Sequence, residues 1–175
     1  AGYISNEIKS KISISKIKFS FFNKLEMNGI LIKDQHNDTI IYVPTITIGI
    51  RNINLRNNIT KLGKVVVIKP VVAFITDSTG LMNLTWYLNL IQNKKDTTSG
   101  GRSYFHINQI DISDARFSLI NKYAPPPKTP LDLNNIRITG INVIVENLDV
   151  WKDSSSLDIY NLGARESSGF VVKKM

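Results

Sequence analysis

The side chains that could take part in chemistry are few, and their spacing forms no catalytic or metal-binding set. The two histidines, His36 and His106, stand far apart, and neither has a second ligand at the spacing of a metal site. The chain has no cysteine, which excludes disulfides and thiolate metal sites. It also has no serine elbow, phosphate-binding loop or dinucleotide fingerprint. We therefore expect a protein that binds rather than an enzyme, and we expect no cofactor.

The polar stretch 33–39 comes closest to a cation site, because it places His36 between Asp34 and Asp38. It lacks the glycine and the further ligands of a calcium loop. Short polar side chains build turns by bonding to nearby backbone groups. We therefore interpret Asp34, Asp38 and Thr39 as the builders of a hairpin turn. Two further carboxylate pairs are interpreted as turn and edge residues: Asp111 with Asp114, and Asp149 with Asp153.

The elements that position these residues are strands whose apolar spacing shifts by one residue. Leu25 and Met27 alternate with polar residues, and after the shift Ile30 and Ile32 continue the alternation. The polar turn then separates this stretch from the next apolar run, which starts at Ile40. We interpret the stretch as a strand, a shift, a strand, a turn and a further strand.

The same shift recurs over residues 12–21, 105–119 and 136–150. Side chains alternate between the two faces of a strand, so one extra residue would turn every later side chain to the other face. The chain must therefore bulge, turn or move to another sheet face at each shift. Gly29 and Gly140 stand in or beside such shifts, as a bulge or tight bend requires.

This pattern predicts a mainly-β fold: a curved, strongly twisted antiparallel sheet whose apolar concave side forms an open groove. An ordinary sandwich or small barrel with a closed core fits the same pattern equally well. The strand over residues 60–68 is expected to continue past Pro70. One short amphipathic helix is expected at residues 83–95, with Asn83 as a candidate N-cap.

The candidates for the lining of the groove are apolar residues on the predicted strands. They are Ile17, Phe19, Phe21, Ile30, Ile32, Ile46, Ile48, Val65, Val67, Ile110, Ile112, Phe117, Val143 and Val145. The sequence does not decide which of them face a groove and which fill a closed core.

Length and composition indicate one folded domain over residues 1–175. Within it we expect a flexible loop at residues 96–103 and a stiff, proline-rich connector at 124–130. No apolar run approaches the ~18 residues that a membrane span needs. Because the sequence opens without an initiator methionine, we expect it to be a segment of a longer protein from which a signal peptide or an anchor helix has been removed.

The net charge of +8 is distributed unevenly. Residues 1–76 carry eleven basic against four acidic residues, and residues 77–175 carry eleven against ten. A basic surface favours anionic partners, although a solvated basic face is the simpler interpretation. We expect no nucleic-acid partner, because residues 51–69 contain no aromatic side chain on which a base could stack. The candidate contacts to lipid head groups are Arg51, Arg56, Lys61 and Lys64.

One stretch combines a strand ending in Phe-Phe-Asn with Leu-x-x-x-Gly-x-x-Ile-x-Asp, an Asp-Thr pair and an apolar Tyr. Its residues are Phe21, Phe22, Asn23, Leu25, Gly29, Ile32, Asp34, Asp38, Thr39 and Tyr42. This pattern resembles the N-terminal periplasmic region of TamB-like translocation and assembly module proteins, in the form found in Bacteroidota. The later stretches TGLMNLTWYLNLI, FHINQIDISDARFSLIN, PLDLNNIRITGINVIVENL and LGARESSGFVV are similar to the next elements of that family. The resemblance covers residues 12–172.

The resemblance implies an inner-membrane anchor helix followed by a long, mostly β periplasmic body. This body is a β-groove or taco with an apolar interior, as in AsmA-like proteins. Such a body bridges the periplasm, conducts phospholipid acyl chains toward the outer membrane and supports envelope biogenesis. Its partner, an outer-membrane β-barrel assembly protein, would engage regions outside this segment. The alternative is a chaperone-like scaffold that assists the assembly or secretion of outer-membrane β-barrel proteins by binding them at a strand edge.

Overall fold

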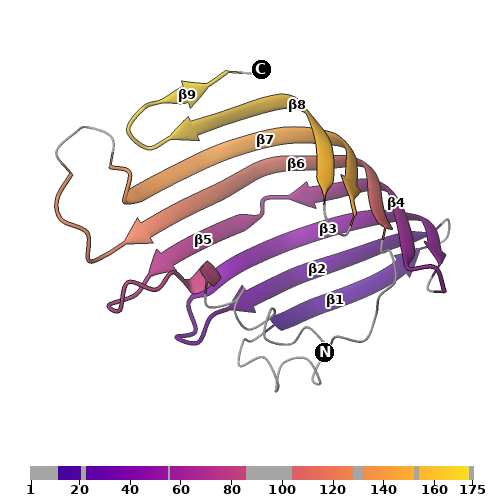
Figure 1. Ribbon diagram of the computed structural model, residues 1–175, viewed down its shortest axis with the longest axis horizontal. Helices are drawn as coiled ribbons and strands as arrows, with labels where there is room; N and C mark the ends of the chain where they lie inside the picture. The colour runs from indigo at the N-terminus through magenta and orange to yellow at the C-terminus, as the bar shows by residue number, and fades with distance from the viewer. Residues whose placement is uncertain are drawn as a thin grey trace.

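The alternating apolar residues form nine strands in the computed structural model, which describes residues 12–20, 23–54, 56–85, 104–127, 132–151 and 154–173 (Figure 1). The predicted mainly-β fold is confirmed. In chain order the strands are β1 (Ile12–Ser20), β2 (Lys24–Lys33), β3 (Thr39–Asn54), β4 (Ile59–Ile68), β5 (Val71–Thr76), β6 (Tyr104–Asn121), β7 (Asn135–Val150), β8 (Ser155–Glu166) and β9 (Val171–Val172).

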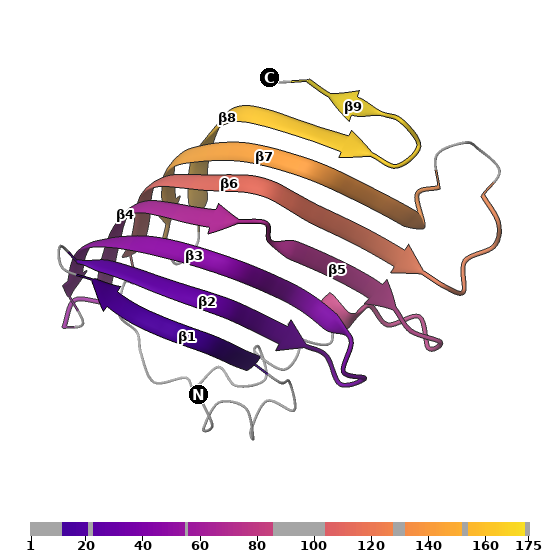
Figure 2. The ribbon, with the colours of Figure 1, turned by 180° about the vertical axis from the view of Figure 1, so that it is seen from behind.

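All nine strands belong to one strongly curved sheet (Figures 1 and 2). Its order is β1-β2-β3-β4-β6-β7-β8-β9, and β5 also lies between β3 and β6. Neighbouring strands are antiparallel except at β6, which pairs in parallel with both β4 and β5. A parallel pair needs a long crossover, and residues 77–103 supply one between β5 and β6. No pairing among the described residues joins β1 to β9, so these two strands stand at the edges.

β4 and β5 occupy one strand position that is interrupted at Lys69 and Pro70. Lys69 has a positive φ of 51°, and its N–H donates to Ser113 O at 2.8 Å. The Pro70 carbonyl accepts from Arg116 N at 2.9 Å. The expected continuation of this strand past Pro70 is therefore confirmed. The break is local, because both halves pair with β3 and with β6.

Five of the shifts in apolar spacing, but not those before Ile17 and Ile110, coincide with residues in the left-handed backbone region. They are Gly29 (φ 63°), Asp114 (φ 51°), Gly140 (φ 59°), Asn147 (φ 51°) and Asn161 (φ 53°). Each is the second of the two residues that separate successive apolar positions. Gly, Asn and Asp are the residue types that adopt this conformation at least cost. The prediction that the strands bulge at these shifts is confirmed in β6, β7 and β8 by shifts in register, whereas the pairing of β2 continues through Gly29 without one.

Several of these irregularities lie at one level and form a line across the sheet, which we call the crease. It runs through Gly29, Lys69, Asp114 and Gly140, as the register of the strands shows. At the crease, Asp114 N donates to Asn142 Oδ1 at 3.0 Å, and Asn142 Nδ2 donates to Gly140 O at 2.9 Å. The side chains thus satisfy backbone groups that the ladder leaves without a strand partner.

The described strands form a single layer. Every pair of strands in extensive contact is a pair of hydrogen-bonded neighbours. Among the described residues the buried apolar side chains are few: Ile40, Val65, Ile107 and Ala115. A sandwich would bury the facing sides of two packed sheets, and the described residues contain no second sheet.

The predicted helix begins at Asn83, and the structure describes its residues 83–85 as helical. The buried amide of Asn83 bonds to β5, accepting from Ile75 N at 3.1 Å and donating to Ala73 O at 3.2 Å. The expected role of Asn83 as N-cap involves the helix residues outside the described ranges and stays a prediction. The other predictions that fall outside the described residues are Phe21, helix residues 86–95, the loop 96–103 and connector residues 128–130.

No helix among the described residues is long and apolar enough to cross a membrane.

Candidate functional site

Two rows of apolar side chains cross the sheet on one side, which we call the apolar face. Residues directly opposite one another on paired strands point to the same side, so the register defines each row. The first row, from β1 to β7, is Ile17, Met27, Ile46, Val67, Ile112 and Val143. The second, from β1 to β8, is Phe19, Leu25, Ile48, Val65, Ile110, Val145 and Ile159. With strands about 4.8 Å apart, the second row spans roughly 29 Å.

The second row is most shielded at the centre of the sheet and open to solvent at both of its ends. Val65, in the middle, is 4% exposed, whereas Phe19 on β1 is 77% exposed and Ile159 on β8 is 59% exposed. The residues between them are half-buried. A continuous apolar surface that no described element covers is typical of a binding surface rather than of a core.

Most of the predicted lining residues stand in these two rows. Those in the rows are Ile17, Phe19, Ile46, Ile48, Val65, Val67, Ile110, Ile112, Val143 and Val145. The register places Ile30, Ile32 and Phe117 beyond the crease, where Ile32 and Phe117 belong to a further row with Ile41 and Val72. Phe21 lies outside the described residues.

The apolar face continues across the crease. We call the opposite side of the sheet the polar face. One hollow on the polar face is lined both by Asn142 and by Thr139, which lie on different sides of the crease. Asn142 alternates with Val143, and Thr139 alternates with Ile138. Val143 and Ile138 therefore share the apolar face, because the left-handed Gly140 restores the alternation that the extra residue would have reversed.

The apolar face deepens into a pocket of about 470 Å³ beside β9. Ile136, Ile138, Phe170 and Val172 contribute apolar walls, and Glu166 lies at the same pocket. Hydrogen bonds from Ser168, and then from Ser167, hold the pKa of Glu166 at about 2. The carboxylate stays ionised at neutral pH, and the adjoining turn satisfies it, with Ser168 N at 2.6 Å and Ser167 Oγ at 2.7 Å.

Lys64, one of the predicted head-group contacts, points to the polar face. It forms an ion pair with the Asp111 carboxylate, which also accepts from Gln109 Nε2 at 2.6 Å. Because Lys64 alternates with the buried Val65, its ammonium group lies on the side away from the apolar rows. Lys64 is therefore placed to hold the polar face together.

The other predicted head-group contacts lie near the end of the sheet that carries the β3–β4 hairpin. Arg56 is exposed in that hairpin. Lys61 stands over the Tyr104 ring, with Nζ 5.8 Å from the ring centroid. Arg51 Nη1 donates to the Asn108 side-chain oxygen at 3.1 Å. The three cations thus share one end of the molecule, where β6, β7 and β8 also bend sharply (Figure 1).

A polar cluster that the sequence did not predict lies at this same end. The Tyr104 hydroxyl donates to Asp149 Oδ1 at 2.6 Å, and His106 Nδ1 lies 2.7 Å from the same oxygen. His106 Nε2 accepts from the Asn108 amide at 3.2 Å, which assigns the ring proton to Nδ1. The Trp151 ring packs against Tyr104 with centroids 5.7 Å apart.

The cluster joins β6 to β7 through side-chain hydrogen bonds. Hydrogen bonds from Tyr104, and then from His106, lower the pKa of Asp149, and the bond from Tyr104 raises the pKa of the Tyr104 hydroxyl. Both ring nitrogens of His106 take part in this network. The spacing of Tyr104 and His106 predicts a shared face, but Asp149 could be added only once the β6–β7 register was known.

The predicted turn residues Asp34, Asp38 and Thr39 lie between β2 and β3. The buried Asp34 carboxylate accepts from His36 N at 2.8 Å and from Asp38 N at 2.9 Å, and Asp34 N donates to Asp38 O at 2.9 Å. Thr39 is the first residue of β3 and pairs with Lys33. The side chain of Asp34 therefore organises the hairpin that begins β3.

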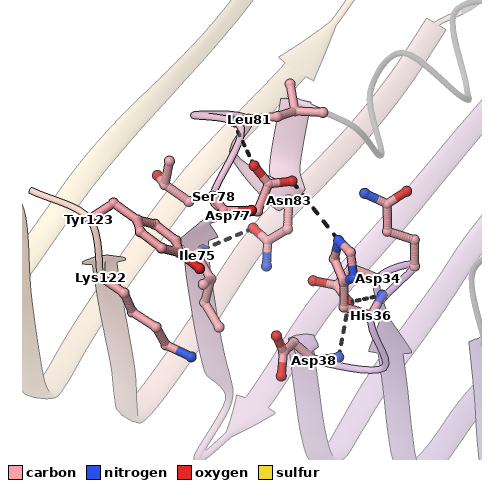
Figure 3. Close-up of a pocket in the computed structure, with 12 residues that line it drawn as sticks. Asp34, His36, Asp38, Ile75, Asp77, Ser78, Leu81, Asn83, Lys122 and Tyr123 are labelled. Atoms are coloured by element: carbon pink, nitrogen blue, oxygen red, sulfur yellow. Dashed lines mark hydrogen bonds and ion pairs between the residues drawn. The ribbon is translucent and has the colours of Figure 1, made fainter.

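A pocket of about 250 Å³ separates this hairpin from the turn that follows β5 (Figure 3). His36 Nε2 lies 3.9 Å from Asp77 Oδ2 across it. Asp77 accepts from Thr79 and from Leu81 N, and these hydrogen bonds, chiefly that from Thr79, lower its pKa. No group of three metal-ligating side chains occurs among the residues that the structure describes. The pocket is best explained as the space between two turns.

Comparison of the sequence with protein-family models and with curated proteins finds no match. The structure therefore assigns this protein to a fold class: it is a mainly-β protein with one curved sheet, one apolar face and one polar face.

Proposed function

We propose that the apolar face holds phospholipid acyl chains and that the chain is the groove-forming part of a TamB-like bridge. In this proposal the full-length protein is anchored in the inner membrane and conducts phospholipid across the periplasm toward the outer membrane. The protein is not an enzyme, and its further partner is an outer-membrane β-barrel assembly protein that binds outside this segment.

The observation that carries the proposal is the pair of apolar rows. They are continuous from β1 to β7 and β8, uncovered by any described element, and exposed at both edges of the sheet. Shielding an acyl chain from water is favourable by ~0.8 kcal/mol per buried CH₂ group. Neighbouring positions along such rows are chemically alike, so a chain can slide between them without breaking a specific bond.

The basic end of the sheet suits the head group. Lys61 lies there over the ring of Tyr104, against which Trp151 packs, and Arg51 and Arg56 lie at the same end. Basic and aromatic side chains together are typical of a membrane–water interface. This part of the proposal predicts stronger binding to anionic than to neutral liposomes at low salt, and equal binding to both would remove it.

Photo-crosslinking from two adjacent residues of β4 tests the groove. A photoreactive side chain at Val67 would lie in the first apolar row, whereas one at Val66 would point to the polar face. The purified chain is mixed with phospholipid and irradiated. We expect lipid adducts at Val67 at least about tenfold more often than at Val66, and equal labelling at both positions would refute a one-sided groove.

A matched pair of substitutions provides an independent test. Ile159→Asp places a charge at the exposed end of the second row, and Ile68→Asp makes the same change at a 41% exposed residue of the polar face. Only Ile159→Asp is expected to reduce the phospholipid that copurifies with the protein. Thermal unfolding of both variants shows whether either loses lipid merely because it fails to fold.

The chaperone-like scaffold remains the second candidate, and a specific edge favours it. β9 pairs with β8 only at Ala164 and Arg165, so residues 155–162 of β8 have no strand partner on that side among the described residues. An extended segment of an unfolded outer-membrane protein could add to this edge by backbone pairing. Crosslinks to such proteins alone, without lipid adducts at Val67, would favour this function over lipid transport.

A further inference from the structure

A hollow on the polar face has the features of an anion site. It has a volume of about 520 Å³ and lies at the crease, between β6, β7, β8 and β9. Arg116 and Arg165 stand on either side of it, and Thr139 and Asn142 also line it. The hollow lies on the opposite side of the sheet from the apolar rows, so it has no part in the proposed acyl-chain groove.

The strand register places the two arginines in line across the hollow. Arg165 pairs directly with Thr139. Because Phe117 pairs with Ile138, the preceding residue Arg116 stands opposite Thr139 from the other side. The two arginine backbones are therefore two strand spacings apart, roughly 10 Å, with a threonine hydroxyl between them. Side chains as long as arginine can converge over that distance on one small group.

Both guanidinium groups are without a partner in the part of the chain that the structure describes. Neither Arg116 nor Arg165 forms an ion pair or a side-chain hydrogen bond there, and both are exposed. Asp114 is the acidic residue of the lining, and it forms no ion pair with either arginine. Two arginines whose charges no described acid neutralises are suited to an external oxyanion, which the planar guanidinium binds through paired N–H groups.

The crease explains why there is room at this point. Gly140 and Gly163 both line the hollow, and a Cβ added at Gly140 would meet nothing within 4 Å. At Gly163 an added Cβ would meet only the Val172 carbonyl, at 3.8 Å. The missing side chains leave the backbone floor open between the arginines.

We infer that this hollow binds a phosphate-bearing group, held between Arg116 and Arg165 with the Thr139 hydroxyl as a third donor. A tetrahedral phosphate presents oxygens in several directions, which suits donors that approach from two sides and from the floor. Such a group could belong to a phospholipid head group or to a soluble phosphate, and the two sources share this recognition chemistry.

The first test is a titration of the whole chain with inorganic phosphate at constant ionic strength. Binding is monitored through the NMR signals of the backbone amides and the arginine guanidinium groups. Arg116→Gln and Arg165→Gln should each weaken phosphate binding at least about tenfold, a loss of ~1.4 kcal/mol. The matched control is Arg137→Gln, which removes the same charge from an exposed arginine of β7 on the same face but outside the hollow. An equal loss in the control would overturn the proposal in favour of general electrostatic attraction.

A steric variant removes the space without altering any charge. Gly163 has an ordinary strand backbone, so Gly163→Phe should fold and fill the hollow. Phosphate binding should fall as far as in Arg165→Gln, with an unchanged unfolding temperature. Unaltered binding in a folded Gly163→Phe protein would refute the site.

Flotation with vesicles separates the two sources of phosphate. Vesicles of phosphatidylcholine with phosphatidylglycerol are compared with vesicles of phosphatidylcholine alone, for the wild type and for Arg165→Gln. Vesicle binding that Arg165→Gln abolishes and inorganic phosphate competes away supports a head group. If the binding of inorganic phosphate depends on Arg165 but the binding of vesicles does not, the natural ligand is a soluble phosphate. If neither phosphate binding nor vesicle binding depends on Arg165, the inference is wrong. The proposal of an acyl-chain groove would not be affected, because crosslinking at Val67 tests it separately.

Discussion

Replacement of Gly29 by alanine tests how the crease is built. Gly29 has a φ of 63°, where an L-residue with a side chain pays roughly 1–2 kcal/mol. An added Cβ would also stand 2.9 Å from Ser15 Cβ on the neighbouring strand, which is closer than carbon atoms approach without displacement. Because the obstructing atom is next to the backbone, β1 itself must move. We expect a total loss of about 2–4 kcal/mol in the free energy of unfolding.

Gly140 provides the matched control, because it has nearly the same φ of 59° but no atom within 4 Å of an added Cβ. Gly140→Ala should therefore cost only the backbone part, roughly 1–2 kcal/mol. In the double variant Gly29→Ala with Ser15→Gly, the steric part should be recovered. Urea unfolding measures all of these variants, and a domain of this size loses about 2–4 °C in Tm per kcal/mol. Equal costs at the two glycines, or no recovery with Ser15→Gly, would refute the account of the crease.

Three further substitutions test the packing and the electrostatics. Ile40→Ala should lower the free energy of unfolding by about 2–4 kcal/mol, because Ile40 is only 1% exposed, whereas Phe19→Ala should change it by less than about 0.5 kcal/mol in the same urea titration. Glu166→Gln should destabilise the protein at neutral pH. Since the pKa of Glu166 is lowered to about 2 from an ordinary 4.5, its ionised form stabilises the fold above pH 4.5, and the difference between wild type and variant should disappear as the pH falls toward 2. A difference that persists unchanged at pH 2 would contradict this assignment. Lys64→Ala should cost at most about 1 kcal/mol through loss of the Asp111 ion pair, and 1 M salt should reduce that cost; a cost that salt leaves unaltered would indicate packing instead.

The spacing of apolar residues was sufficient to predict strands, their shifts and the existence of one apolar face. Alternation along a strand is a local property, so Val65 and Val67 could be assigned to one face before any pairing was known. The left-handed residues were partly foreseeable, because Gly29 and Gly140 stand in the shifts. Asp114, Asn147 and Asn161 carry the same signal in residue types that tolerate this conformation.

The polar groupings could not be predicted in the same way. Lys64 with Asp111, and Tyr104 with Asp149, are brought together by pairing between strands that are distant in the sequence. Each such contact depends on which strands are neighbours and in what register, and a one-residue change of register would separate the partners.

The period-two alternation and the residue types at the shifts are properties of the sequence, and they specify the two unlike faces of the sheet. The strand pairing adds what local spacing does not contain. It makes β6 parallel to β4 and β5, aligns the apolar positions of distant strands into continuous rows, and places Arg116 and Arg165 on either side of one hollow. The difference lies in the range of the forces involved. Backbone conformation and facing follow from neighbours in the chain, whereas strand order and register follow from the pairing and burial of segments far apart in the chain.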